Sequence, residues 1–545
     1  MEPRRRLGVQ DALWLEMDRP NNLMVVDSVI WTAQPLDFAK VRAVVEERLL
    51  NRYPVFRSLA VKDDDGSWWW ELDENFDFDN HVALISLKKP DDPRALQELV
   101  GAHRTEMLDR NRPLWQAIWV KRYRGGSAMI LRSHHAIADG MRMVQLSMSL
   151  FDATPQGGPI MAPAVIQQGV QTQPPGQSVA QRVRATAAGA AQAAGGVISR
   201  VTGALGGLAD APQALQQVGR MGRFALRNPL GAGDTVVHAV QATGAAVVQT
   251  VRAALLPGGG SMVDVFSAAP GDVDTLRKLL IGTRNDATIW TGEAGGEKSV
   301  AWSEPMSLPA IKAVARANRC TVNDVLVTTV AGTLHDYLKA HGARCSSVTF
   351  MVPVNLKPID LTLPETLGNE FALVQLELPT DEPDAGKVLE AAKRRMDRIK
   401  NGHEAAVAFR LQETIAGFSR SLYEASVDLF TNRTLGTLTN VPGPPMPVYL
   451  AGSLVDGMVG WAPISGDQPM SFTIYSYDGE VTVGIACDTK LVPDHEMIIE
   501  GFGAAFARLV DATPGADLMQ ITWGGAGRGP RGPKQGPGRG RDRRR

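Results

Sequence analysis

Two segments with alternating helix-like and strand-like hydrophobic patterns, residues 7–151 and 299–512, are separated by a segment of different composition. Residues 154–180 are rich in Pro, Gln and Gly, which is typical of a solvated linker. A chain of 545 residues also exceeds the length at which one hydrophobic core keeps growing. We therefore predict two domains of α/β or α+β class with a long connecting region. The predicted boundaries are 1–152 for the first lobe, 153–298 for the linker and insertion, 299–512 for the second lobe and 513–545 for a disordered Gly/Pro/Arg tail.

The insertion contains an Ala- and Gly-rich stretch, residues 181–256, whose aliphatic residues are spaced as on one face of a helix. Its charged residues are mostly arginine, opposed by only Asp210 and Asp234. Low hydrophobicity with local positive charge suits a helix that lies on an anionic lipid surface. A helical insertion packed loosely on the protein is an equally good interpretation, because many glycines weaken helices.

Charge and cysteine content limit the class of protein. The net charge of −1 provides no overall attraction to nucleic acid, so we expect no nucleic-acid partner. The three cysteines show no C-x-x-C spacing, which indicates a reducing compartment without structural zinc or disulfides. The basic N-terminus is followed by acidic residues and not by the apolar core of a signal peptide. No apolar run is long enough to span a membrane. We expect a cytoplasmic protein that is soluble or lies on a lipid surface.

The stretch Ser133–Gly140 reads Ser-His-His-Ala-Ile-Ala-Asp-Gly and follows an apolar run, Ala128–Leu131, that is typical of a buried strand. Because adjacent residues of a strand point to opposite faces, only one of His134 and His135 can face a given cleft. Two structural histidines, with Asp139 as an ordinary helix N-cap, are the simpler interpretation. The combination of two histidines, a three-residue spacer, Asp and Gly is rarer, and it favours a catalytic role for these residues over a structural one.

Proton transfer is the chemistry most compatible with this stretch. A neutral imidazole at a cleft, with a nearby carboxylate that fixes the local geometry, can accept a proton from a hydroxyl near neutral pH. A metal site is less compatible, because adjacent residues rarely chelate one ion and no further His/Glu cluster lies nearby. The sequence contains neither a G-x-S-x-G nucleophile motif nor a G-x-x-x-x-G-K-[ST] phosphate loop. The residues alone thus predict a general-base histidine between two domains, with no metal.

The pattern H-H-x-x-x-D-G resembles the signature of the CoA-dependent acyltransferase superfamily, which includes chloramphenicol acetyltransferases and peptide-synthetase condensation domains. Further motifs are similar, in the same order, to those of the bacterial wax ester synthase/diacylglycerol acyltransferase branch. They are Asp11-Ala12-Leu13-Trp14, Pro113-Leu114-Trp115, Thr321-Val322-Asn323-Asp324-Val325, Gly368-Asn369, Asn440-Val441-Pro442-Gly443-Pro444 and Leu491-Val492-Pro493-Asp494. The resemblance covers about residues 7–151 and 299–512.

This resemblance implies two chloramphenicol-acetyltransferase-like α/β lobes with the active site at their interface. It implies that His135 is the general base with His134 as its support, and that Asp139 holds the loop through a salt bridge. Gly140 is expected to permit a close turn. The other expected substrate-binding residues are Pro113, Leu114 and Trp115 along a channel, and Asn323, Asp324 and Asn440 from the second lobe.

The resemblance also implies a reaction. A long-chain fatty acyl group would move from acyl-CoA, a co-substrate, to diacylglycerol or a long-chain alcohol, without a resident cofactor. The protein would then work at the inner face of a membrane or at lipid droplets. Two alternatives stay open: acyl transfer to a polyketide or glycolipid alcohol, and a non-catalytic scaffold on a lipid surface.

Overall fold

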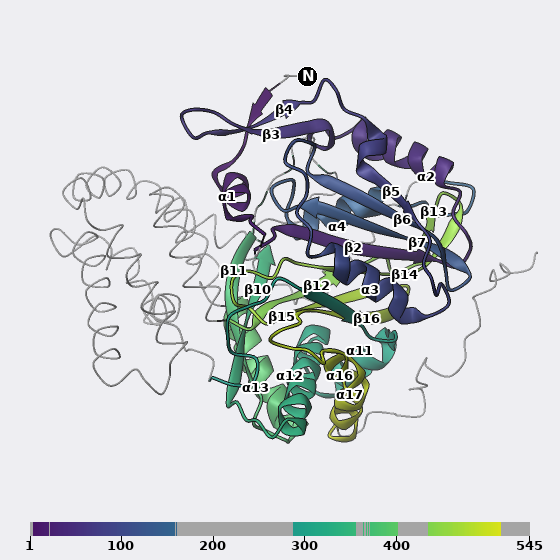
Figure 1. The fold of residues 1–545 in the computed structure, drawn as a ribbon. Helices are drawn as coiled ribbons and strands as arrows, with labels where there is room; N and C mark the ends of the chain where they lie inside the picture. The colour runs from purple at the N-terminus through teal and green to yellow at the C-terminus, as the bar shows by residue number, and fades with distance from the viewer. Residues whose placement is uncertain are drawn as a thin grey trace, which may run out of the picture.

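The computed structural model describes residues 4–20, 22–158, 160, 287–355, 363, 367, 369, 371–401 and 434–513. The stretch predicted as a surface helix, 181–256, and the predicted tail beyond residue 513 lie outside these residues. The described residues form two α/β lobes, each built on a large sheet (Figure 1). The predicted two-lobed α/β class is confirmed.

The first lobe has a six-stranded sheet in which antiparallel pairs predominate, with β5 parallel to β6. In spatial order its strands are β13 (Tyr449–Leu450), β14 (Ser453–Trp461), β2 (Val25–Thr32), β7 (Gly126–His134), β6 (Trp115–Tyr123) and β5 (Val82–Ile85). Its helices are α1 (Val9–Met17), α2 (Phe38–Val45), α3 (Pro93–His103) and α4 (Gly140–Ser149), with short helical turns η1 (Glu46–Leu50), η2 (Pro54–Arg57) and η3 (Phe78–His81). A smaller sheet contains β1 (Arg4–Arg6), β4 (Trp68–Leu72) and β3 (Ser58–Lys62).

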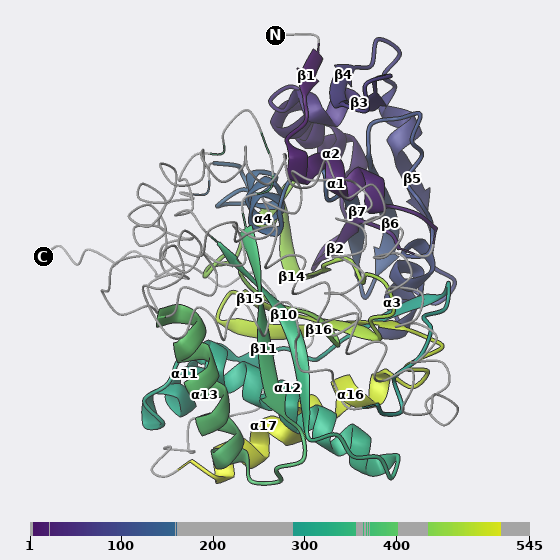
Figure 2. The same cartoon turned by 90° about the vertical axis from the view of Figure 1, so that its left-hand side faces the viewer.

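The second lobe has a seven-stranded sheet whose helices cover the face turned away from the first lobe (Figures 1 and 2). Its strands are β11 (Phe371–Pro379), β10 (Ser347–Asn355), β12 (Gly436–Pro442), β15 (Met470–Tyr477), β16 (Glu480–Asp488), β8 (Lys298–Trp302) and β9 (Met306–Ser307). Its helices are α11 (Leu308–Ala317), α12 (Val322–Ala340), α13 (Ala385–Asn401), α16 (Glu496–Glu500) and α17 (Phe502–Asp511). Among the described helices none combines the length and the apolarity needed to cross a membrane.

Helix α12 is the central helix of this lobe, and local sequence explains where it begins. The hydroxyl of Thr321 accepts a hydrogen bond from the Asp324 backbone N–H (3.2 Å), and the Asp324 carboxylate accepts one from the Thr321 N–H (2.8 Å). This capping box satisfies two backbone donors that the first turn leaves unpaired. The apolar side chains that follow are buried against the sheet.

Strand β14 connects the lobes. It follows β12 in the chain and lies within the 299–512 segment, but it pairs antiparallel with β2 and so completes the first-lobe sheet. A bulge between Val455 and Gly457 adjusts its register. A Cβ added at Gly457 would lie 2.1 Å from Cζ2 of Trp31, so glycine leaves the room that this indole occupies. The two lobes therefore share a strand, which fixes their relative position.

A buried charge network reinforces this connection. The two carboxylate oxygens of Asp27, on β2, accept hydrogen bonds from Arg104 Nη1 (2.6 Å) and Arg132 Nε (3.1 Å). Arg104 also donates to the carbonyl of Ala462, directly after β14 (3.0 Å). All three charged side chains are buried. Such a network stabilises only while every charge keeps its partner.

Candidate active site

The two histidines lie where β7 ends. The backbone N–H of His134 donates to the Leu114 carbonyl (2.9 Å), and that of His135 donates to the Met24 carbonyl (2.8 Å). Strand alternation turns the two side chains apart. His135 lines a cavity between the lobes, whereas His134 is fully buried.

His134 lies in a polar pocket behind the strand. Its Nδ1 accepts a hydrogen bond from the Ala136 backbone N–H (3.1 Å), which puts the ring proton on Nε2, 3.6 Å from Asp18 Oδ2. Arg110 donates to the same Asp18 oxygen (2.8 Å). Burial lowers the pKa of His134, and the neighbouring Asp18 acts in the opposite direction. His134 thus anchors the loop from the side away from the cavity.

His135 is held on two sides. The indole of Trp14, on α1, stacks on its imidazole with ring centroids 4.3 Å apart and an interplanar angle of 27°. Nδ2 of Asn369 donates to its backbone carbonyl (2.9 Å). Burial lowers the pKa of His135 from 6.5 to about 4. The imidazole is therefore neutral at physiological pH and available as a proton acceptor.

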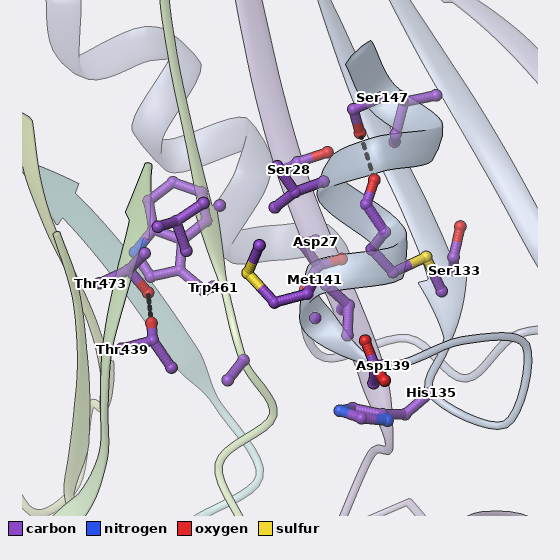
Figure 3. Close-up of a pocket in the computed structure, with 18 of the residues that line it drawn as sticks. Asp27, Ser28, Ser133, His135, Asp139, Met141, Ser147, Thr439, Trp461 and Thr473 are labelled. Atoms are coloured by element: carbon purple, nitrogen blue, oxygen red, sulfur yellow. Dashed lines mark hydrogen bonds between the residues drawn. The ribbon is translucent and has the colours of Figure 1, made fainter. Parts of the chain in front are cut away.

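The cavity next to His135 has a volume of about 330 Å³ and lies between the two large sheets, as the predicted interface site requires (Figure 3). Residues of β2, β7, α4 and η1 form its first-lobe wall, and residues of β10, β11, β12 and β15 form the opposite wall. Strand β14 lines it from Met458 to Trp461. Most lining side chains are apolar, and the hydroxyls of Thr439 and Thr473, 3.2 Å apart, are a polar position on the second-lobe wall (Figure 3). A chain-like aliphatic substrate suits such a cavity.

Asp139 and Gly140 both line this cavity at the start of α4. The Asp139 carboxylate is the N-cap of the helix and accepts a hydrogen bond from the Arg142 backbone N–H (2.9 Å). The prediction that Gly140 permits a close turn is wrong. Its φ is not in the left-handed region, and a Cβ added there would meet no atom of the described chain within 4 Å. The glycine leaves open space at the cavity wall instead.

The other predicted substrate-binding residues divide into two groups. Trp115 and Asn440 line the cavity. The rest of the predicted set, Pro113, Leu114, Asn323 and Asp324, is not among the lining residues. Leu114 acts through its carbonyl on His134, and Asp324 belongs to the α12 capping box. Asn323 accepts a hydrogen bond from Nδ2 of Asn440 (3.2 Å), so Asn323 contacts a residue of the cavity wall without lining the cavity itself.

The sequence did not predict the roles of Trp14, Asp18 and Asn369. Trp14 and Asn369 belong to the motifs Asp11–Trp14 and Gly368–Asn369, but their contacts with His135 are tertiary: Trp14 packs on it within the first lobe, and Asn369 reaches it from the second. Asp18 carries no sequence signal for its place next to His134. In the described part of the chain, no three His, Cys, Asp or Glu side chains gather as metal ligands would.

Comparison with solved structures defines the class of this fold. The wax ester synthase/diacylglycerol acyltransferase from Marinobacter aquaeolei VT8 is 16% identical, with a TM-score of 0.56 over 93% of this chain and 100% of that one. The first condensation domain of the calcium-dependent antibiotic synthetase is 14% identical, with a TM-score of 0.51 over 95% of this chain and 100% of that one. The protein therefore has the two-lobed, chloramphenicol-acetyltransferase-like fold.

Family comparison identifies the branch. The model of the wax ester synthase/diacylglycerol acyltransferase catalytic domain matches residues 7–326, and the WS/DGAT C-terminal domain matches residues 367–510. The chain belongs to the wax ester synthase/diacylglycerol acyltransferase family and is an acyltransferase. Two Mycobacterium tuberculosis proteins, Rv1760 and Rv3087, have provisional names as diacylglycerol O-acyltransferases. Each match is 25% identical and covers 93% of this chain. The match covers 90% of Rv1760 and 97% of Rv3087.

Proposed function

We propose that this enzyme transfers a long-chain fatty acyl group from acyl-CoA to the free hydroxyl of diacylglycerol and, in the same way, to long-chain alcohols. The observation that carries the proposal is the buried, neutral His135 at the wall of an apolar cavity between the lobes. The names of the mycobacterial relatives and of the Marinobacter enzyme support these acceptors. The reaction needs no resident cofactor, because acyl-CoA brings an activated acyl group.

In the proposed reaction, Nε2 of His135 accepts the proton of the acceptor hydroxyl as its oxygen attacks the thioester carbonyl carbon. The tetrahedral adduct then collapses, the carbon–sulfur bond breaks and the imidazolium returns its proton to the CoA sulfur. Burial disfavours the imidazolium, which promotes this return. One ester forms and one CoA thiol is released for each turnover, with no net change in protons.

Steady-state assays of the purified full chain test the acceptor class. We expect radiolabelled palmitoyl-CoA to yield labelled triacylglycerol with diolein and labelled wax ester with hexadecanol. A glycolipid alcohol as a third acceptor covers the alternative reaction. Label in the glycolipid alone, or in no ester at all, would refute the proposed acceptors.

We further propose that the protein works in the cytoplasm, attached to the inner membrane face or to lipid droplets through residues 181–256, where arginine predominates among the charged residues. We expect the protein to float with vesicles that contain anionic lipid and to lose this binding as salt rises. The variant to compare carries Arg→Gln changes at Arg182, Arg184, Arg200, Arg220, Arg223, Arg227 and Arg252. Unchanged flotation of this variant would exclude these arginines as the attachment site.

A further inference from the structure

Helix α1 carries a second side chain close to the His135 site, that of Asp11, one turn before Trp14. The carboxylate of Asp11 is buried and accepts two hydrogen bonds from Asn369, one from Nδ2 (2.7 Å) and one from the backbone N–H (3.2 Å). These two residues are 358 positions apart in the chain. Burial raises the pKa of Asp11 to about 6, so this carboxylate is kept in the interior at a cost in free energy.

The Asn369 amide is fixed in one orientation. Its Nδ2 donates to Asp11 Oδ1 (2.7 Å) and to the His135 carbonyl (2.9 Å), which accounts for both amide hydrogens. A flipped amide would put its oxygen against a carboxylate and a carbonyl. Asn369 Oδ1 is therefore held as a buried acceptor that meets no hydrogen-bond donor within the described residues.

Burial is the largest effect on the pKa of His135 and lowers it, while the backbone of His135 itself and, to a smaller extent, the side chain of Asn369 favour the protonated ring and raise that pKa. An acceptor next to an imidazole acts in this direction, because it favours a ring N–H on its own side. A neutral imidazole carries one proton. If the acceptor keeps that proton on Nδ1, the lone pair is on Nε2.

A purely structural tie between the lobes would need only the bonds between Asp11 and Asn369. The additional bond to the His135 backbone carbonyl connects this tie to the base itself. Trp14, on the same helix, restrains the ring by stacking. The backbone and the ring plane of His135 are thus both restrained from α1.

We propose that Asp11 and Asn369 are positioning residues for His135: Asp11 fixes the Asn369 amide, which holds the His135 backbone and keeps the imidazole proton on Nδ1. The lone pair of Nε2 is then ready for the acceptor hydroxyl. This inference rests on the proposed function, in which His135 is the base. It adds a device that selects the tautomer of that base.

A charge swap separates the positioning role from a structural one. Asn369→Asp puts a carboxylate against the His135 carbonyl and against Asp11, and we expect kcat to fall about 100-fold with little change in KM. In the double variant Asp11→Asn/Asn369→Asp, the amide at position 11 can donate to the new carboxylate. The swap should therefore restore the melting temperature, but not kcat, because position 369 can no longer donate to His135. Recovery of kcat together with stability would reduce the pair to a structural tie and overturn the proposal.

Asn318→Asp is the matched control. The Asn318 amide likewise donates to two acceptors, the Val314 carbonyl and the Thr513 hydroxyl, both at 3.0 Å and away from the cavity. We expect this variant to lower the melting temperature without lowering kcat. A comparable loss of kcat would show that any lost amide pair has the same effect, and would overturn the proposal.

The imidazole ¹⁵N resonances of histidine-labelled protein test the tautomer without an activity assay. The His135 signals are identified by their loss in His135→Gln. We expect the Nδ1–H form in the wild-type protein and a larger share of the Nε2–H form in Asn369→Leu. An Nε2–H form in the wild-type protein would overturn the inference. Wild-type protein inactive on every acceptor, but with the Nδ1–H form, would refute the proposed function alone.

Discussion

Replacement of His135 by glutamine is expected to lower kcat by about 10²- to 10⁴-fold, the usual contribution of a positioned general base. Glutamine keeps a polar side chain of similar reach under Trp14 but accepts protons too weakly to act as a base. The loss should appear in kcat and kcat/KM together, because the lost interaction forms only in the transition state. Initial rates of ester formation at saturating acyl-CoA measure it. A variant that keeps wild-type kcat would remove His135 from the mechanism.

The control for this change is His335→Gln. The Nδ1 of His335 lies 2.8 Å from the carbonyl of Thr380 in the second lobe, away from the cavity. We expect its kcat to match that of the wild-type protein. Equal losses in the two variants would indicate a general effect of losing a histidine.

The pH dependence of kcat/KM follows from the lowered pKa of His135. A base works when deprotonated, so activity is lost as pH falls through the pKa of the folded protein, which burial moves from 6.5 to about 4. In the unfolded chain the ring takes up its proton near 6.5, so the same group also makes folding less favourable as pH falls from about 6.5 to about 4. The acid limb due to His135 should therefore lie well below pH 6.5. A limb at 6.5 would indicate a solvated imidazole.

Asp27→Asn is expected to lower the free energy of unfolding by about 3–5 kcal/mol, because it leaves Arg104 and Arg132 buried without their shared counter-charge. Asparagine has nearly the same shape, so the loss reports charge and not packing. Urea unfolding followed by tryptophan fluorescence measures it.

The matched control is Asp91→Asn. Asp91 pairs with Arg122 at 3.1 Å, but both side chains are largely exposed, at 68% and 63%. Exposed pairs contribute about 0–1 kcal/mol, so the control should change stability little. If both variants lose equally little, the network around Asp27 does not stabilise the lobe connection.

Local signals were sufficient for much of the fold. The Thr321–Asp324 capping box explains from four consecutive residues where α12 begins, and strand alternation separates His134 from His135 as predicted. The order of the motifs was enough to predict the two lobes. The start of α12 and the separation of the two histidines depend on residues close in sequence, where spacing and side-chain chemistry determine the outcome.

The features that the sequence did not predict depend on tertiary contacts. The pattern of β14 indicates a strand, but nothing in it specifies β2 as the partner across the lobes. The contact of Asp11 with Asn369 depends on the docking of two distant segments. The role of Gly140 was mispredicted because glycine suggests backbone freedom, whereas the structure shows open space at a cavity wall. The supporting groups of the site thus depend on tertiary contacts, within the first lobe for Trp14 and Asp18 and between the lobes for Asn369.

Single-turnover transfer is the most direct test of the central proposal, that His135 promotes direct attack of an acceptor hydroxyl on acyl-CoA. Excess full-length protein is mixed with labelled palmitoyl-CoA and diolein, and the label is followed in thioester, ester, free fatty acid and protein. We predict that the label leaves the thioester and enters triacylglycerol at the same rate, with none on the protein. Label that accumulates on the protein, or that ends in free palmitate with acceptor present, would contradict direct transfer.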